Sequence, residues 1–256
     1  MSKILFFDVD GTLYNSQKQL PDSTKKAIYA ARENDHEIAI ATGRAPFMIE
    51  ELLRDLEIDT YVSFNGQYVV HKGEVIFADS VEKNELAEII AFGMQRGEPV
   101  VFLDDREMVA SISSDVRVEE SLATLKYPYP RIDAQFYEVQ SVYQTLIYVT
   151  QENEYLYRKA FPNVQFVRWH PYSCDILPKN GSKARGIEKL LAYTGKSLQD
   201  AVAFGDGLND VEMIKAVGTG VVMGNGHEET LAVADVVAPH VDDDGIAKVM
   251  RQLQLI

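Results

Sequence analysis

The chain contains 256 residues, of which 46% are hydrophobic and 25% charged, so its length permits one large or two modest domains and its composition excludes disordered and fibrous proteins. Lys and Arg number 25 against 39 Asp and Glu, and the net charge of −14 disfavours binding to nucleic acid or to an anionic membrane surface. One cysteine, Cys174, excludes an internal disulfide and a Cys-based zinc cluster, and no run of about 18 apolar residues predicts a membrane span.

The first residues lack the features of a secretion signal. The apolar run after Met1-Ser2-Lys3 is short, ends at Asp8 and is followed by no small-residue cleavage site. A single cysteine also fits a reducing compartment. We therefore expect a cytoplasmic protein.

Short apolar runs alternate with helical patterns at both ends of the chain. Continuous runs, typical of strands buried on both faces, are Ile4–Phe7, Ile38–Ala41, Tyr61–Phe64, Ala201–Phe204, Gly220–Met223 and Val236–Ala238. Helical spacing is found over Ser23–Glu33, Phe47–Leu56 and Ser182–Tyr193. This alternation predicts an α/β fold in which residues 1–81 and 182–256 form a doubly wound, Rossmann-like core domain with a parallel sheet.

The middle of the chain has a different pattern. Predicted strands are Pro99–Leu103, Met108–Ile112, Val142–Val149, Val164–Trp169 and Ser173–Leu177, and predicted helices are Glu85–Gln95 and Glu152–Phe161. Some of these strands alternate apolar and polar residues, which favours an antiparallel sheet. We expect residues 82–181 to form an inserted α+β domain.

Two acidic residues follow the first predicted strand, in the segment Asp8-Val9-Asp10-Gly11-Thr12-Leu13. Open α/β sheets place ligands at the carboxyl ends of their strands. The two charges repel each other unless a cation offsets them, and hard carboxylate oxygens suit Mg²⁺. The alternative is an ordinary Asp/Gly turn that leaves a strand.

A second acidic segment, Gly205-Asp206-Gly207-Leu208-Asn209-Asp210, follows the strand Ala201–Phe204. Asp206 or Asp210 could complete a metal site, and the glycines permit close approach of the backbone. The alternative is a turn with an N-cap for the next helix. The glycine spacing does not match a dinucleotide-binding fingerprint.

Two further segments offer groups that bind anions. Thr42-Gly43-Arg44 lies between a predicted strand and helix, where a hydroxyl and free N–H groups can cradle a phosphate, although an ordinary N-cap would use the same residues. Lys183 lies at the start of a predicted helix, where its charge opposes the helix dipole and so suggests an anionic partner. A solvated surface lysine is the alternative.

Together, the four segments resemble the four signature motifs of the haloacid dehalogenase superfamily. They are Asp8-Val9-Asp10-Gly11-Thr12, Thr42-Gly43-Arg44, Lys183 and Gly205-Asp206-Gly207-Leu208-Asn209-Asp210, in that order. The position of the insert, between the second and third motifs, is similar to that of the cap domain in the Cof-type phosphatase branch. The segment Ser63-Phe64-Asn65-Gly66 also resembles the segment that follows the third core strand in that branch.

The resemblance implies catalytic roles for the first motif. Asp8 would be the nucleophile that forms an aspartyl-phosphate, and Asp10 would be the general acid and base. Mg²⁺ would be held by Asp8, by the backbone carbonyl of Asp10 and by Asp206, with Asp210 acting in support or through water.

The other motifs are expected to bind the phosphoryl group. Thr42 and the Gly43 amide would contact its oxygens, and Arg44 belongs to the same substrate-binding segment. Lys183 would neutralise the nucleophile and the phosphoryl charge. Asn209 would contact the phosphate or orient Lys183.

The predicted function is therefore a Mg²⁺-dependent phosphatase, a phosphoric monoester hydrolase, acting on small phosphorylated metabolites such as sugar phosphates. We expect no nucleic-acid or membrane partner and no obligate protein partner. Two alternatives use the same site: a phosphomutase that passes the phosphoryl group between hydroxyls, and a non-catalytic phospho-acceptor or sugar-phosphate sensor.

Overall fold

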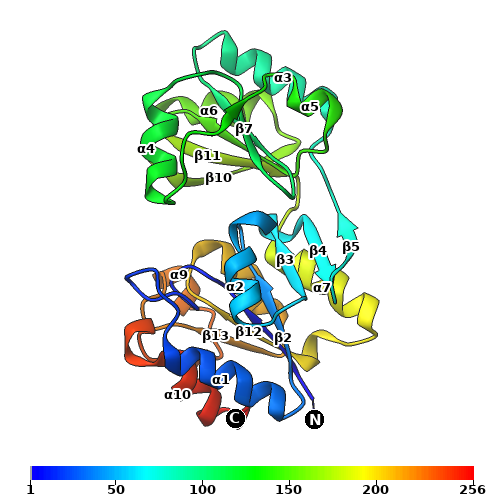
Figure 1. Ribbon diagram of the computed structural model, residues 1–256, viewed down its shortest axis with the longest axis vertical. Helices are drawn as coiled ribbons and strands as arrows, with labels where there is room; N and C mark the ends of the chain where they lie inside the picture. The colour runs from blue at the N-terminus through cyan, green and yellow to red at the C-terminus, as the bar shows by residue number, and fades with distance from the viewer. Residues whose placement is uncertain (1) are drawn as a thin grey trace. The chain divides into compact units, whose positions relative to one another are not determined.

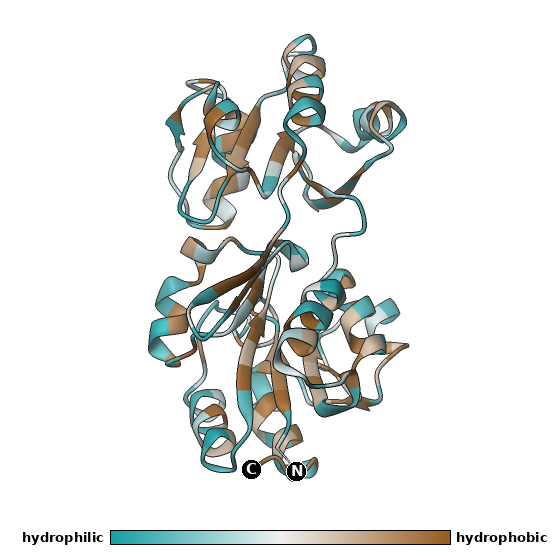
Figure 2. Ribbon diagram, turned by 90° about the vertical axis from the view of Figure 1, so that its right-hand side faces the viewer, coloured by the Kyte–Doolittle hydropathy of each residue, from teal (hydrophilic) through white to brown (hydrophobic). Residues whose placement is uncertain are grey.

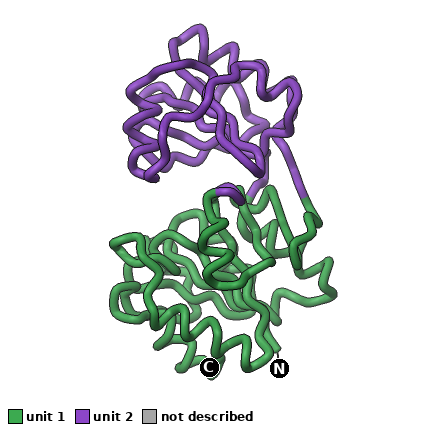
Figure 3. The backbone as a smooth tube through the Cα atoms, in the orientation of Figure 1, with its two compact units in different colours: residues 1–44, 48–77, 182–256 green, residues 45–47, 78–181 purple. Residues whose placement is uncertain are grey.

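The computed structural model describes residues 2–256 as two compact units (Figure 3). We call residues 1–44, 48–77 and 182–256 the core unit, and residues 45–47 and 78–181 the cap unit. Apart from residues 45–47, the cap unit spans residues 78–181, and the insert predicted from the sequence spans residues 82–181. The roles of the two units as catalytic domain and cap stay a prediction.

The core unit is built on an eight-stranded sheet (Figure 1). Its strands are β1 (Ile4–Phe7), β2 (Glu37–Ala41), β3 (Tyr61–Ser63), β4 (Tyr68–His71), β5 (Glu74–Ala78), β12 (Ala201–Gly205), β13 (Thr219–Val222) and β14 (Val236–Val237). They lie in the order β14-β13-β12-β1-β2-β3-β4-β5. The pairs from β14 to β3 are parallel, which confirms the predicted doubly wound α/β class.

The predicted sheet was wrong at one edge, because β4 pairs antiparallel to β3 and β5 follows it. The run Tyr68–His71 is apolar enough to be a strand, the turn at Phe64-Asn65-Gly66 reverses the chain between β3 and β4, and the turn at Lys72-Gly73 leads on to β5. Edge strand β5 is exposed or half-buried along its length, although residues 75–78 form an apolar run like those of the central strands.

Helices cover both faces of the core sheet. They are α1 (Asp22–Glu33), α2 (Glu50–Asp55), α7 (Lys183–Thr194), α8 (Val211–Ala216), α9 (Glu228–Leu231) and α10 (Gly245–Gln252). Alternate residues of β1 point to opposite faces: Leu5 and Phe7 belong to the apolar cluster with α1 and α10, whereas Ile4 and Phe6 pack with α7 and α8. The predicted helix Phe47–Leu56 is split into a 3₁₀ turn, Pro46–Met48, and the short α2.

The order of the strands places β1 at a topological switch point. From β1 the chain continues to β2 on one side, and it returns much later to β12 on the other side. Open α/β sheets bind ligands beyond the carboxyl ends of the strands at such a point. The fold therefore directs attention to the residues that follow β1, β2 and β12.

The cap unit contains a six-stranded sheet with its own apolar core. Its strands are β6 (Val100–Leu103), β7 (Met108–Ala110), β8 (Arg131–Ile132), β9 (Gln144–Tyr148), β10 (Val164–His170) and β11 (Ser173–Pro178), in the order β10-β11-β9-β6-β7-β8. Its helices are α3 (Lys83–Met94), α4 (Val116–Thr124), α5 (Phe136–Val139) and α6 (Gln151–Ala160). Neighbouring strands of this sheet are antiparallel except β7 with β8, which confirms the predicted α+β character.

Hydrophobic residues are concentrated on the strands of both sheets (Figure 2). Among the described residues, no helix has the length and apolar character needed to cross a membrane.

Candidate active site

Three carboxylates converge beyond the ends of β1 and β12. Asp8 follows β1, Asp206 follows β12, and Asp210 lies one turn further along the chain. One oxygen from each lies within 4.8 Å of the others. Asp8 and Asp210 are buried, with 7% and 0% of their surface exposed, and Asp206 is half-buried. These acidic groups are nearly 200 residues apart in sequence and meet because β1 pairs with β12.

Lys183 supplies the positive charge of this cluster. It lies in the first turn of α7, is fully buried, and places Nζ 2.7 Å from Asp8 Oδ1 and 2.6 Å from Asp210 Oδ1. Burial acts to lower the pKa of Lys183, but the carboxylates of Asp210 and Asp8 raise it above its ordinary value. The two carboxylates therefore favour the charged form of Lys183, and the solvated-lysine alternative is wrong because the side chain is buried.

Burial also raises the pKa of Asp8 well above its ordinary value, and only part of this effect is offset by Lys183. Asp210 and Asp206 add to the increase because their charges repel that of Asp8. A single ammonium group faces three carboxylates, so the negative charge in this cluster exceeds the positive charge. The cluster is short of one or more positive charges.

Asp206 is held by the first motif. Thr12 donates its hydroxyl to Asp206 Oδ1 at 2.7 Å, and a Cβ on Gly11 would lie 2.2 Å from Asp206 Oδ2. Gly11 also has φ +76°, which an L side chain rarely adopts, so glycine is needed twice over here. Burial raises the pKa of Asp206 to about 6, although the Thr12 hydrogen bond opposes this shift.

Asp210 organises the loop that carries Asp206. Its Oδ2 accepts hydrogen bonds from the backbone N–H groups of Asp206, at 2.9 Å, and Gly207, at 2.8 Å. Its other oxygen faces Lys183. Asp210 thus links the acidic loop after β12 to the start of α7.

Asp10 has a different environment from Asp8. Its carboxylate is half exposed and accepts two hydrogen bonds of 2.7 Å from the Arg44 guanidinium. Arg44 follows β2, so the pair ties the loop after β1 to the loop after β2. The predicted substrate-binding guanidinium therefore contacts the predicted acid and base.

The other predicted phosphate-binding groups lie beside one another. Thr42 is buried, and its Oγ1 accepts a hydrogen bond from the Arg44 N–H at 3.2 Å. Asn209 donates its amide to Asn65 Oδ1 at 2.9 Å, and the side chain of Asn65 packs against Gly43. Asn65 thus connects two of the predicted binding segments.

Comparison with known proteins identifies the family. A family model described as haloacid dehalogenase-like hydrolase matches residues 5–250. The chain belongs to this family. The resemblance found in the sequence is therefore confirmed, and so is the predicted enzyme class, a phosphoric monoester hydrolase.

Relatives of this haloacid dehalogenase-like hydrolase match it along its whole length. The candidate phosphatase YkrA of Bacillus subtilis (strain 168) is 40% identical over 100% of this chain and 99% of its own. A crystal structure of a protein from Geobacillus kaustophilus HTA426 has a TM-score of 0.96 at 46% identity, with 100% of both chains covered. The subclass IIB sugar phosphatase BT4131 has a TM-score of 0.87 at 31% identity, again with 100% of both chains covered.

The donor set of this hydrolase fits a divalent metal ion. Carboxylate oxygens are the ligands that Mg²⁺ prefers, and Asp8, Asp206 and Asp210 offer three of them in one cluster. A bound cation would also offset the excess of negative charge in this cluster.

Sequence analysis of this hydrolase assigned no role to Thr12 or Asn65. Both lie in segments that carried the family resemblance, but a hydroxyl or amide there has many ordinary uses in turns. The structure shows that each contacts a predicted site residue, Asp206 and Asn209 respectively. Only the folded arrangement reveals these pairs, because their partners lie more than 140 residues away.

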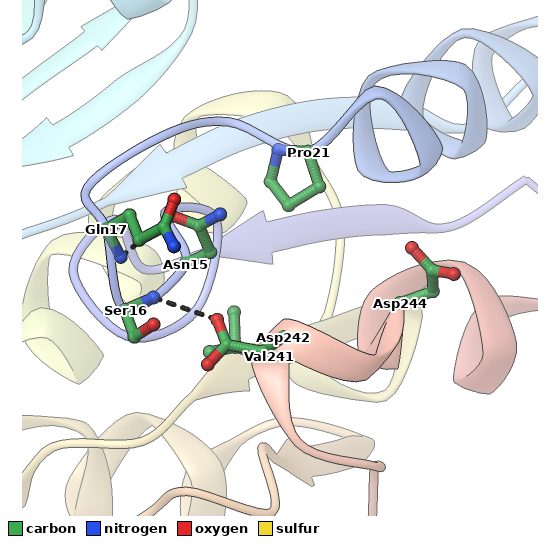
Figure 4. A pocket seen from close by; sticks show the side chains of 7 residues that line it. All are labelled: Asn15, Ser16, Gln17, Pro21, Val241, Asp242 and Asp244. Carbon is green, nitrogen blue, oxygen red and sulfur yellow. Dashed lines mark hydrogen bonds between the residues drawn. The ribbon is translucent and has the colours of Figure 1, made fainter.

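A separate pocket of this hydrolase carries two carboxylates but none of the four motifs' residues (Figure 4). Asp242 accepts a hydrogen bond from the Ser16 backbone N–H, and Asp244 accepts one from the Ser23 hydroxyl. These contacts give both carboxylates a structural role: Asp242 joins the loop after β1, and Asp244 joins the start of α1, to the segment before α10.

Proposed function

We propose that this chain is a cytoplasmic, Mg²⁺-dependent phosphatase that hydrolyses small phosphorylated metabolites through an aspartyl-phosphate on Asp8. The observation that carries the proposal is the placement of Asp8. It lies at the switch point of the sheet, 2.7 Å from a buried ammonium group and within one cluster with two further carboxylates. A buried nucleophile surrounded in this way suits transfer of a highly charged phosphoryl group.

In the first step a carboxylate oxygen of Asp8 attacks phosphorus, and the bond from phosphorus to the ester oxygen breaks. Asp10 donates a proton to the departing alcohol. In the second step Asp10 removes a proton from water, the water oxygen bonds to phosphorus, and Asp8 is released with inorganic phosphate as the product. Two carboxylates are needed because one is covalently occupied while the other moves protons.

Asp10 must leave part of its present contact with Arg44 to perform this role. Both carboxylate oxygens of Asp10 are turned toward Arg44, whose guanidinium they accept hydrogen bonds from. Release of at least one bond would free an oxygen for the leaving group. Arg44 therefore controls the orientation of Asp10 in the proposal.

Mg²⁺ would be held by Asp8, Asp206 and the backbone carbonyl of Asp10, with Asp210 in support. When bound, it would neutralise charge on the transferring phosphoryl oxygens. Lys183 would neutralise charge on Asp8 and on the phosphoryl group, while Thr42, Gly43 and Asn209 would hold the phosphoryl oxygens by hydrogen bonds.

Small metabolites are favoured as substrates by two observations. The chain has a net charge of −14, which disfavours polyanionic macromolecules. Its structural relative BT4131 is described as a sugar phosphatase, and it shares 31% of its residues with this chain over the full length. A phosphorylated sugar or a compound of similar size is the proposed substrate class.

The test is hydrolysis of p-nitrophenyl phosphate by the purified protein. We expect phosphate release with Mg²⁺, loss of release with EDTA and recovery when Mg²⁺ is restored. Asp8→Asn and Asp10→Asn should each be inactive, whereas Asp22→Asn, a matched change of an exposed aspartate in α1, should keep full activity. Full activity of the Asp8 variant would overturn the proposal.

A screen of phosphorylated metabolites then separates this reaction from its two alternatives. Release of inorganic phosphate supports hydrolysis. An isomerised sugar phosphate without release would show a mutase, and a stable aspartyl-phosphate without turnover would show a phospho-acceptor.

A further inference from the structure

The turn that follows β3 has an unfavourable backbone conformation. Phe64, Asn65 and Gly66 have φ angles of +49°, +50° and +94° in succession. Glycine accepts such angles, and asparagine tolerates them, but a bulky phenylalanine rarely does. Phe64 is fully buried, so surrounding contacts hold this turn in place.

Backbone hydrogen bonds tie the turn to the loop after β2. The Phe64 N–H donates to the Arg44 carbonyl and the Asn65 N–H donates to the Thr42 carbonyl, each at 3.1 Å. The turn therefore shares two direct bonds with the segment that carries the predicted phosphate-binding groups.

The Asn65 side chain lies between two of those groups. It is 5% exposed, and its Oδ1 accepts the Asn209 amide at 2.9 Å. A Cβ on Gly43 would lie 3.0 Å from both Oδ1 and Nδ2 of Asn65, so the amide packs directly on the Gly43 backbone. Asn65 thus touches the loop after β2 and the loop after β12 at once.

The same turn supports the helix that carries Lys183. A Cβ on Gly66 would lie 1.9 Å from the Ser182 carbonyl oxygen, and a Cβ on Gly186 would lie 2.9 Å from the Gly66 Cα. The first turn of α7 therefore lies directly against Gly66. Phe64-Asn65-Gly66 is therefore in contact with the second motif, with the fourth motif and with the helix that carries Lys183.

We propose that Asn65 is a positioning residue, whose amide aligns Asn209 and the Gly43 backbone for contact with the transferred phosphoryl group. This inference rests on the proposed function, because it assigns Asn65 to the same site. An exclusively structural role would need the left-handed backbone but not the amide. The two roles can be separated, since glycine keeps the backbone conformation and removes the amide.

The experiment compares Asn65→Gly with wild type. We expect a folded protein whose kcat/KM for p-nitrophenyl phosphate falls by about 10- to 100-fold, the usual effect of losing a group that orients a direct ligand. Inorganic phosphate should also inhibit the variant more weakly, with a higher inhibition constant than for wild type. Lys72→Gly, which changes a left-handed residue in the turn between β4 and β5, is the matched control and should keep wild-type activity.

A double-mutant cycle tests the alignment of Asn209. If Asn65 acts through Asn209, then adding Asn209→Ala to Asn65→Gly should reduce kcat/KM by much less than it does in wild type. Fully additive losses would limit Asn65 to a role independent of Asn209 and would overturn that part of the inference. Wild-type kcat/KM and phosphate inhibition in a folded Asn65→Gly protein would overturn all of it.

Two further arms keep the result decisive. If Asn65→Gly does not fold, Asn65→Ala also removes the amide, and Lys72→Ala matches its backbone strain; we expect the Asn65 variant to bind inorganic phosphate more weakly than the Lys72 variant, and equal binding would overturn the inference. If wild type itself releases no phosphate, the proposed function fails. Calorimetric binding of inorganic phosphate with Mg²⁺ then tests Asn65 separately.

Discussion

Lys183 combines complete burial with two ion pairs, and this combination makes it important for stability as well as for catalysis. Removing one partner of a buried ion pair leaves the other charges without compensation. In Lys183→Met, Asp8 and Asp210 would remain buried beside each other with no ammonium group. We expect the free energy of unfolding to fall by about 3–5 kcal/mol without metal, measured by urea denaturation.

Lys189→Met is the control for this change, because Lys189 lies on the same helix and is exposed. It should alter the free energy of unfolding by no more than about 0.5 kcal/mol. Equal effects of the two substitutions would contradict the importance of the buried ion pairs.

Asp175 is a second buried carboxylate, and it lies in β11 of the cap unit. It is 7% exposed, and its Oδ1 has no hydrogen-bond partner among the described residues. Burial raises its pKa to about 8 from 3.8, although the nearby Trp169 and Gln144 side chains act to lower it. A raised pKa means that the folded state binds this proton more tightly than the unfolded state, so stability declines as pH rises from about 4 to about 8.

Asp175→Asn removes this titration. Its free energy of unfolding relative to wild type should therefore increase between pH 5 and pH 8, by up to about 1.4 kcal/mol for each pH unit. Thermal unfolding at several pH values measures the difference, with the exposed Glu120→Gln as the control in the same unit. A difference that is constant with pH would show that Asp175 is ionised throughout this range.

Some site residues were predictable from their sequence motifs, and others were not. Asp8 and Asp206 follow strands in the way that acidic ligands do, so their positions were predictable from pattern. The burial of Lys183 was not predictable, since a lysine at a helix start is usually solvated. Asn65 received no role, because its contact with Asn209 depends on the packing of two loops.

At the scale of elements, strand ends were predicted well where the apolar runs were continuous. β1 was predicted with the bounds that the structure shows. The strand predicted over Tyr61–Phe64 ends at Ser63, because Phe64 turns into the left-handed region. Helix α4 was missed although Val118 and Leu122 form its buried face, because it spans only nine residues.

Because the turn at Gly66 contacts α7 closely, adding a single methyl group at Gly66 should disturb the helix. Gly66→Ala would place a Cβ 1.9 Å from the Ser182 carbonyl oxygen, so α7 must shift and carry Lys183 with it. We expect a loss of more than about 1 kcal/mol in the free energy of unfolding, together with a large decrease in kcat for p-nitrophenyl phosphate.

Gly73→Ala is the matched control, because Gly73 also has positive φ but has no atom within 4 Å of its added Cβ. The Gly73→Ala variant therefore has the backbone strain of a positive φ but no steric clash. If both variants lose stability equally and keep activity, the close contact with α7 has no effect on the site.

At the scale of the whole molecule, the two units have separate apolar cores, and only the core unit carries the proposed metal site. The acidic cluster belongs to the core unit, whereas Trp169, the only tryptophan in the sequence, belongs to the cap unit. Tryptophan fluorescence therefore reports on the cap unit, and far-ultraviolet circular dichroism reports on both units.

Mg²⁺ should raise the unfolding temperature seen by circular dichroism, because binding to the folded state alone stabilises it by about 2.7 kcal/mol at a hundredfold excess over Kd. The transition seen by tryptophan fluorescence should move less. Asp206→Asn should remove most of the increase. Identical shifts by both probes would show that the two units unfold as one.

The central position of β1 has a consequence for biosynthesis. One edge of β1 pairs with β2, which the ribosome makes soon afterwards, but its other edge pairs with residues 201–204. At about 5–20 residues per second, the nascent chain waits roughly 10–40 s for that partner while the whole insert is translated. During this interval an apolar strand has a free edge that can pair with other chains. Such a protein is expected to depend on translation speed and on chaperones that shield new chains.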